Sequence, residues 1–317
     1  MKPHAFIDDG QDVRRVSPEE ASAACRTAQL VWINLEVRDE RTRDFLSGTL
    51  GLPDLVVSAL TAVETRPRCE AIGEGALINL RGLSLTDEPD ADELVSIRVW
   101  TGRGIIVSVA RYTLCNFPRL VAAFERHQVK DPGDFVALLA EGITDDLDPD
   151  VAELGDRLDQ CELHLDATRA FQLRRGIADV RAKAIEYRRF VAPQRQALER
   201  LAALPCDWLD EDDRLHLNEA ADRFARMTEE LESVRERAAL MHEQITDLRA
   251  EQTEQRGLLI SVLALVFLPL TFLTGLYGMN VPLPYQEERW AFYAILALSA
   301  AVVVGGVGYF LRARWFR

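Results

Sequence analysis

Residues 257–280 read GLLISVLALVFLPLTFLTGLYGMN and contain no charged side chain. The uncharged run continues to Gln286, and a second one extends from Trp290 to Leu311. A transmembrane helix needs about 20 consecutive apolar residues, and each of these stretches supplies them. Two uncharged helices of this length are rare in the core of a soluble domain, so the sequence predicts two membrane spans.

The residues outside the spans predict the orientation of the chain. The first ten residues, MKPHAFIDDG, lack the apolar core of a signal peptide, so we expect residues 1–256 to stay in the cytosol. Arg256 flanks the first span, and Arg312, Arg314 and Arg317 follow the second. Basic residues collect on the cytoplasmic side of membranes. We therefore expect a multi-pass protein of a bacterial-type inner (plasma) membrane, in contact with the lipid bilayer, with both termini in the cytoplasm.

Composition argues against several classes of function. The net charge is −14, and no basic patch suggests a polyanion partner, so nucleic-acid binding is disfavoured and a surface that attracts cations is expected. The five cysteines are scattered without a C-x-x-C pair, which fits reduced cytosolic thiols. The sequence contains no phosphate-binding glycine loop, nucleophile elbow or metalloprotease helix, so we expect no enzyme.

The first half of the chain mixes strand and helix patterns. Runs rich in β-branched residues predict strands at 29–36, 75–85, 94–101 and 104–110, the last two joined as a hairpin across Gly102-Arg103. Helical patterns cover 39–50, 53–64, 116–128 and 132–147. We predict an α+β cytoplasmic domain over 1–148, followed by long helices and the two C-terminal transmembrane helices.

Two long helical segments follow this domain. Apolar residues spaced by three and four after Pro149, and a second helical run at 173–204, predict an antiparallel helix pair over 149–205 that ends at Pro205. The segment 206–256 carries an apolar heptad repeat, here called the heptad seam: Leu217, Ala220, Phe224, Met227, Leu231, Val234, Ala238, Met241, Ile245 and Leu248. A repeat this long predicts a cytoplasmic stalk helix that packs against other helices along its length.

The stalk contains no glycine or proline from Asp207 to Arg256, so we expect it to continue into the first span as one helix of about 100 Å. The next seam positions are polar, Gln252 and Gln255. They are either ordinary polar residues at a helix end or a sign that several copies of the helix surround a wet axis. We favour the second interpretation.

One stripe of the first span, on the amino-terminal side of Asn280, passes at helical spacing through Thr271, Leu268, Ala264, Ile260 and Gly257. If this stripe lines a pore, its apolar throat could close by dewetting. The alternative is that it packs on the second span, where Ala297, Ala301 and Gly305 form a small-x-x-x-small face.

Glycine and proline residues mark the outer end of the first span. Gly275 and Gly278 are expected to let the chain leave helical geometry, and Pro282 prevents the helix from resuming. Asn280 would then sit in a turn with its amide oxygen free to accept from water or to meet a cation. This Gly-x-Asn turn is weak as a signal by itself, and it gains weight from its position at the end of a span.

Residues 267–280, FLPLTFLTGLYGMN, closely resemble the signature of the CorA/ZntB superfamily of divalent-cation transporters, whose defining feature is the triplet matched by Gly278, Met279 and Asn280. The resemblance covers the whole chain. The segments ETRPRCE (64–70) and LVSIRVW (94–100) look more like the zinc-carrying ZntB branch than like the magnesium-carrying CorA branch.

The resemblance implies a homopentamer with a CorA-like funnel, in which helix 257–280 lines the pore, 281–289 forms a periplasmic loop, 290–311 forms an outer ring and 312–317 is a basic cytoplasmic tail. Asn280 would form a ring that meets hydrated divalent cations. We expect zinc uptake, with proton coupling left open and no permanently bound cofactor. The alternatives are a Mg²⁺/Co²⁺ channel of the CorA type and a non-conducting, membrane-anchored coiled-coil sensor or scaffold. Val281-Pro282-Leu283-Pro284 departs from both branches and leaves the ion preference open.

Further candidates lie outside the spans. Glu287 and Glu288 could attract cations to the outer end of the pore, and Cys161 with His164 has the spacing of a metal pair on a helix. His216 and His242 lie on the stalk; with the two glutamates they are the first groups to test for proton coupling. The acidic runs 145–150 and 207–213 are expected to cap helices or, as the alternative, to hold a regulatory cation between subunits.

Overall fold

The computed structural model describes residues 4–37, 40–62, 66–86, 92–164, 170–279 and 288–312. The chain forms two compact units: the first comprises 1–164 and 171–242, and the second consists mainly of 243–317. Helix α7 (Glu211–Tyr277) contributes to both units.

A seven-stranded sheet forms the centre of the first unit, with the strand order β2-β1-β3-β7-β6-β5-β4. The strands are β1 (His4–Asp8), β2 (Val13–Val16), β3 (Leu30–Glu36), β4 (Arg68–Ile72), β5 (Gly75–Leu83), β6 (Leu94–Gly102) and β7 (Ile105–Ala110). Only β3 and β7 pair in parallel; the other neighbours are antiparallel. All four predicted strands are present, and the α+β prediction is correct for this unit. The hairpin is confirmed, with its turn at Arg103-Gly104 instead of Gly102-Arg103.

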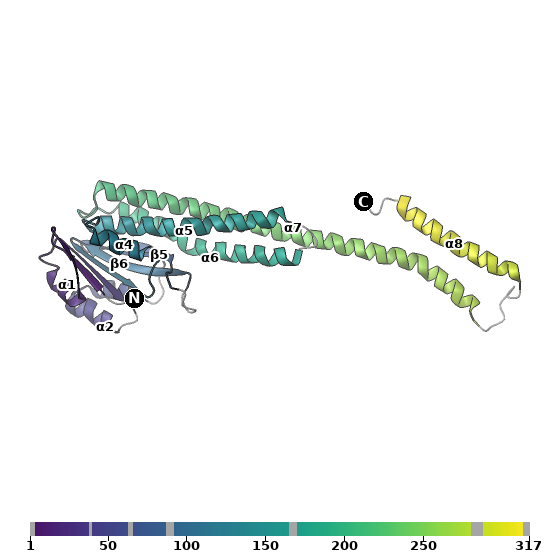
Figure 1. Cartoon of the computed structure of the whole chain (residues 1–317), viewed down its shortest axis with the longest axis horizontal. Helices are drawn as coiled ribbons and strands as arrows, with labels where there is room; N and C mark the ends of the chain where they lie inside the picture. Colours follow the sequence, from purple (N-terminus) through teal and green to yellow (C-terminus); the bar gives the residue numbers. More distant parts are fainter. Residues whose placement is uncertain are drawn as a thin grey trace. The chain divides into compact units, whose positions relative to one another are not determined.

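Short helices cover one face of the sheet (Figure 1). They are α1 (Pro18–Ala24), α2 (Glu40–Asp44), the π-helical turn η1 (Phe45–Thr49) and α3 (Asp54–Leu60). Ala21, Leu46 and Val57 from these elements pack on Ile33 and Val107 of the sheet, and all five are buried. The predicted helix at 39–50 is thus a short α-helix followed by a π-turn.

Aromatic rings fill the opposite face of the sheet, around the fully buried Trp32. Its ring lies 5.4 Å from Phe124 and 4.9 Å from Phe135, between centroids. These two rings come from α4 (Phe117–Glu125) and α5 (Pro132–Leu163). The indole N–H of Trp32 donates to Ser108 Oγ at 2.8 Å, as a buried indole requires. This aromatic cluster fixes α4 and α5 on the sheet.

Helix α5 runs without a break through Pro149, so the predicted end of a helix at residue 147 is wrong. Proline removes one backbone hydrogen bond from a helix interior. The helix persists because Leu147, Val151 and Leu154 lie on one stripe on both sides of Pro149 and are at most 1 % exposed. Buried apolar area outweighs the lost hydrogen bond. Helix α6 (Ala170–Ala202) ends before Pro205, as predicted.

The heptad seam is buried within a single chain. Its members from Leu217 to Met241 are at most 4 % exposed. Ion pairs join α7 to α5 beside the seam: Arg223 to Asp145 at 2.7 Å and Arg237 to Asp159 at 2.5 Å. The chain's own helices therefore occupy the seam up to Met241, and the prediction that the stalk helix packs against other helices is confirmed there. The interpretation of Gln252 and Gln255 as lining a wet axis between copies stays a prediction.

The start of α5 tolerates no side chain at Gly133. A Cβ there would lie 1.9 Å from Asp213 Oδ2 and 2.5 Å from its Cγ. We expect Gly133→Ala to lower the free energy of unfolding by about 2 kcal/mol or more, because the Asp213 carboxyl would have to move. The thermal unfolding midpoint of the purified protein measures this.

Gly155 provides the matched control on the same helix. A Cβ there meets nothing closer than Glu230 Oε1 at 3.7 Å. Gly155→Ala should raise the midpoint slightly, since alanine favours a helix over glycine by roughly 0.5–1 kcal/mol. Equal midpoints for the two variants would contradict the close approach at Gly133.

Candidate functional site

The second unit holds the two apolar helices: the last part of α7 and α8 (Arg289–Arg312). The 24 residues of α8 span about 36 Å at 1.5 Å per residue, enough to cross a bilayer. Trp290 and Tyr293 lie near its start and Tyr309 near its end, and all three are more than half exposed. Aromatic residues at both ends are typical of helices that meet the two membrane interfaces.

One side of α7 faces α8. Val266 and Ala291, one from each helix, are 8 % and 6 % exposed, the most covered residues of the pair. A Cβ on Gly306 of α8 would lie 3.2 Å from Val266 Cγ2, so the helices meet there. The partly covered stripe of α7 is Leu258, Val262, Val266, Leu270 and Leu273, and that of α8 is Ala291, Ile295, Ser299, Val302 and Gly306.

The predicted pore-lining stripe lies on the opposite side of α7. At roughly 100° per residue its mean direction differs by about 180° from that of the stripe facing α8. Its five members, Gly257, Ile260, Ala264, Leu268 and Thr271, are all exposed in the single chain. The two interpretations of the first span thus belong to different sides of one helix.

The contact face of α8 that the alternative required does not meet α7 within the chain. Ala297, Ala301 and Gly305 are all exposed, and the adjacent stripe with Gly306 faces α7 instead. Gly305 and Gly306 are neighbours, so the small-residue pattern alone does not decide which of them makes the contact.

Hydroxyl groups and one proline mark the carboxyl-terminal half of the span. Thr271 Oγ1 donates to the carbonyl of Phe267 at 2.8 Å, and Thr274 Oγ1 to that of Leu270 at 3.0 Å. Both hydroxyl oxygens keep lone pairs that can accept from water. Pro269 lies inside α7 and offers no N–H to the preceding turn. Figure 1 shows the helix curving toward its carboxyl end.

Helix α7 ends at Tyr277, so Gly275 stays helical, contrary to expectation. Gly278 is the first residue beyond the helix, and its N–H donates to the carbonyl of Thr274 at 2.9 Å. A Cβ at Gly278 would lie 3.0 Å from that oxygen, tighter than ordinary contact. Met279 is exposed.

Two of the predicted site residues at the outer end, Asn280 and Glu287, lie outside the described residues. Glu288 is exposed, and its carbonyl accepts from the N–H of Ala291 at 3.1 Å at the start of α8.

Cys161 and His164, the predicted metal pair, lie at the carboxyl end of α5. Cys161 is half-buried, and a Cβ on Gly176 of α6 would lie 3.6 Å from its sulfur. Burial raises the pKa of the Cys161 thiol, which disfavours the thiolate that a metal requires. His164 is exposed at the end of α5, with Nδ1 2.8 Å from the Gln160 carbonyl.

The two stalk histidines, His216 and His242, lie far apart along α7. His216 is exposed, with Nε2 3.8 Å from an oxygen of Asp212, and His242 is half-buried. Neither they nor the pair on α5 belong to any cluster of three or more metal-binding side chains among the described residues.

One carboxylate cluster does form in the described part of the chain: Asp131, Asp134 and Asp213, with one oxygen from each within 4.8 Å of the others. Helix capping explains it. Asp131 accepts from the N–H of Asp134 at 3.0 Å, and Asp213 and Asp210 accept from each other's N–H at 3.0 and 2.8 Å. The capping role expected for the acidic run 207–213 is confirmed, whereas the sequence did not single out Asp131 and Asp134.

Burial raises the pKa of Asp213 to about 7, and the neighbouring carboxylates of Asp131, Asp210 and Asp134 add to the effect. In the unfolded chain an aspartate titrates near pH 4. The folded state therefore holds a proton that the unfolded state has lost between roughly pH 4 and 7. The resulting stability is present at low pH and is lost as pH rises through about 7.

We expect Asp213→Asn, which carries no titrating group, to flatten the pH dependence of unfolding between about pH 4 and 7. Unfolding midpoints at several pH values measure the slope. Asp212→Asn removes an exposed neighbouring carboxylate and should keep the wild-type slope. Identical slopes in all three proteins would show that Asp213 does not titrate in this range.

Comparison with known proteins shows similarity along the whole chain. The family model described as "CorA-like Mg2+ transporter protein" matches residues 27–312. The zinc transport protein ZntB of Pectobacterium atrosepticum is 30% identical over 315 residues, covering 98% of this chain and 95% of that protein.

Two solved structures are similar over nearly their full length. The full-length CmaX protein aligns with a TM-score of 0.79 and 27% identity over 99% of this chain and 98% of its own. The CorA magnesium transporter of Methanocaldococcus jannaschii aligns with a TM-score of 0.81 and 17% identity over 99% of both chains. At that identity the second match shows the fold.

Proposed function

This chain belongs to the family of CorA-like Mg²⁺ transporter proteins, and from that premise we propose that it carries Zn²⁺ through a membrane pore formed by five copies of the chain. The membership makes it a divalent-cation transport protein of the membrane rather than an enzyme. The zinc preference rests on the curated relatives, which are named zinc transport proteins.

The observation that carries the pore proposal is the open stripe of α7. Because α8 covers the opposite side, the stripe from Gly257 to Thr271 is the surface that copies of α7 can turn toward a common axis. Around such an axis, Ile260 and Leu268 form an apolar throat, which closes when water leaves it. Thr271 places hydroxyl groups on the outer side of that throat.

The triplet Gly278-Met279-Asn280 follows at the outer end. We propose that the Asn280 amide oxygens form a ring that accepts hydrogen bonds from the water shell of the arriving ion. A neutral oxygen holds a hydrated cation less tightly than a carboxylate does. The spans contain no histidine or cysteine, the ligands that zinc usually selects, so the ion has to be recognised with its water.

In the main alternative the pore is the same, but the transported ion is different. The family description names Mg²⁺, which takes oxygen ligands and releases its water reluctantly. Spans without histidine or cysteine suit that ion equally well. The CorA-type alternative is therefore a Mg²⁺/Co²⁺ channel.

Proton coupling and membrane placement complete the proposal. The spans contain no ionisable side chain apart from tyrosine, so a proton relay through them lacks the usual carriers. If uptake is proton-driven, we place the titrating groups among Glu287, Glu288, His216 and His242. We propose that the protein lies in the inner membrane with both termini in the cytoplasm. The basic residues that flank the spans support this orientation.

Flux into proteoliposomes tests the proposal, with Zn²⁺, Mg²⁺, Co²⁺ and the pH gradient varied independently. We expect saturable Zn²⁺ uptake that falls at least tenfold in Asn280→Ala while the oligomer stays intact. Asn218→Ala, at an exposed position on the stalk, is the matched control and should keep wild-type flux.

Three outcomes would decide against parts of this account. Mg²⁺ uptake without Zn²⁺ uptake would contradict the zinc preference but not the proposed pore. Unchanged flux in Asn280→Ala would exclude the proposed ring. No flux of any cation would favour the non-conducting sensor or scaffold.

A further inference from the structure

One glycine of the membrane-spanning unit is in close contact with the other helix. A Cβ on Gly306 of α8 would lie 3.2 Å from Cγ2 of Val266 on α7, which is tighter than ordinary van der Waals contact. On the neighbouring glycines of α8, Gly305 and Gly308, a Cβ would meet nothing within 4 Å. The side chain of Val266 therefore fits against one position of α8, and the missing side chain of Gly306 makes room for it.

Gly306 forms a notch in a row of valines. Val302 and Val303 lie one helical turn before it, and Val307 follows it. β-branched side chains keep one preferred χ1 rotamer in a helix, so both the notch and Val266 are stiff. Lipid gives the two helices no hydrophobic reason to associate, so close contact of this kind holds them together. A stiff side chain in a stiff notch resists sideways movement, and this resistance fixes the rotation of α7 about its own axis.

The notch lies level with the proposed throat. Ala264 and Leu268 of the open stripe come two residues before and after Val266, so each lies about 3 Å from it along the helix axis and on the opposite side of the helix. A sideways shift of Val266 by about 1 Å turns α7 by roughly 10°, since side chains end about 5–6 Å from the axis. The throat residues then move by a similar distance in every copy. The radius of a water molecule is about 1.4 Å, so such a shift changes whether a narrow apolar throat holds water.

We propose that Gly306 and Val266 are a positioning pair for the ion pathway, in which the notch sets the rotation of α7 that turns Ala264 and Leu268 toward the common axis. The inference rests on the proposed pore. A side chain at position 306 fills the notch, so Val266 leaves it sideways and the throat residues turn away from the axis. If α8 moves outward instead, α7 loses the support that held its rotation, with the same result.

The pair acts on the throat and not on the recognition of the ion at the outer end. Helix α7 ends at Tyr277, 11 residues or about 16 Å beyond Val266, and the triplet that contains Asn280 follows it. A change at the notch should therefore alter the maximal rate of transport and leave the Zn²⁺ concentration for half-maximal flux unchanged.

Zn²⁺ flux into proteoliposomes, measured over a range of Zn²⁺ concentrations, tests this inference. Gly306→Val should lower the maximal flux at least tenfold and keep the half-saturating concentration within twofold. Gly305→Val and Gly308→Val are the matched controls and should keep wild-type flux, because a Cβ at either position meets nothing. Gel filtration checks that every variant forms the wild-type oligomer. If Gly306→Val fails to assemble, Gly306→Ala adds one methyl group to the notch and should lower the maximal flux at least threefold.

An exchange of size between the two helices separates positioning from damage to the fold. Val266→Ala alone empties the notch and should also lower the flux. Gly306→Val combined with Val266→Ala fills the gap from the other side and should carry at least fivefold more Zn²⁺ than Gly306→Val, a non-additivity expected only of residues in contact.

Three results would overturn the inference: wild-type flux in Gly306→Val, an equal loss in Gly305→Val and Gly306→Val, or no recovery in the double variant. Each of them leaves the proposed pore standing, since the wild type still conducts. A wild-type protein that carries no cation would remove the proposed pore and this inference together.

Discussion

The packing of the membrane-spanning unit depends on which side of α7 contacts α8 in an apolar environment and which side stays exposed. Lipid gives apolar helices no hydrophobic reason to associate, so close contact comes from small residues that let backbones approach. Gly306 supplies that contact by admitting Val266. Once this side of α7 is committed to α8, the opposite stripe of small, apolar and hydroxyl-bearing residues remains open. The pore proposal rests on that division.

In the first unit, a different interaction decides which side of α7 is buried. In water, burial of apolar area drives packing, and the heptad seam from Leu217 to Met241 is buried against helices of the same chain. A stripe that meets its partners within the chain cannot also line an axis between copies. In the proposed pentamer, contact between copies in the soluble region would therefore use the exposed faces of the helices. The same regular repeat that predicted association along the helix does not reveal whether the partner is the same chain or another.

The sequence predicted the features that depend on long patterns. Two uncharged runs, a heptad repeat and four β-branched strands all carry many residues of one kind, and all are present in the structure. The missed strands β1, β2 and β4 are short; β2 reads VRRV and has no fully buried residue. Sheet pairing decides such strands, and pairing is not visible in local sequence.

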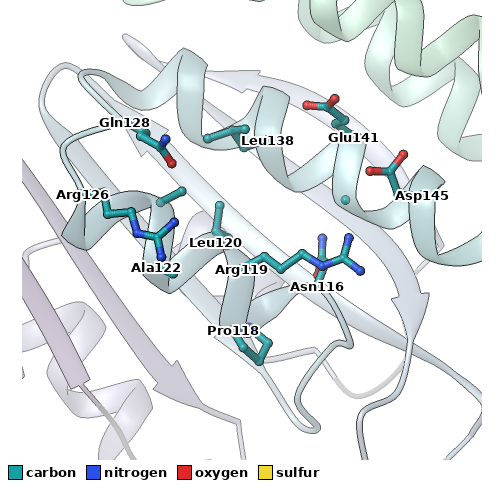
Figure 2. A pocket seen from close by; sticks show the side chains of 12 residues that line it. Asn116, Pro118, Arg119, Leu120, Ala122, Arg126, Gln128, Leu138, Glu141 and Asp145 are labelled. Atoms are coloured by element: carbon teal, nitrogen blue, oxygen red, sulfur yellow. The ribbon is translucent and has the colours of Figure 1, made fainter.

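Single-residue signals were less reliable because packing overrides them. Pro149 does not end its helix, and Gly275 does not unwind α7, since the surrounding turns remain hydrogen-bonded. An open groove between α4 and α5 (Figure 2) escaped prediction for a related reason. Its lining residues Asn116, Arg126 and Glu141 come together only through the packing of α4 on α5, and no spacing along the chain links them.

The central claim is that the side of α7 facing away from α8 lines the ion pathway. Cysteine substitution at Ala264, on the open stripe, and at Val266, on the side facing α8, tests it directly. A membrane-impermeant methanethiosulfonate reagent is added during Zn²⁺ flux, and the unsubstituted protein controls for the native cysteines. The account predicts a block in Ala264→Cys and none in Val266→Cys. A block in Val266→Cys with Ala264→Cys unaffected would contradict it.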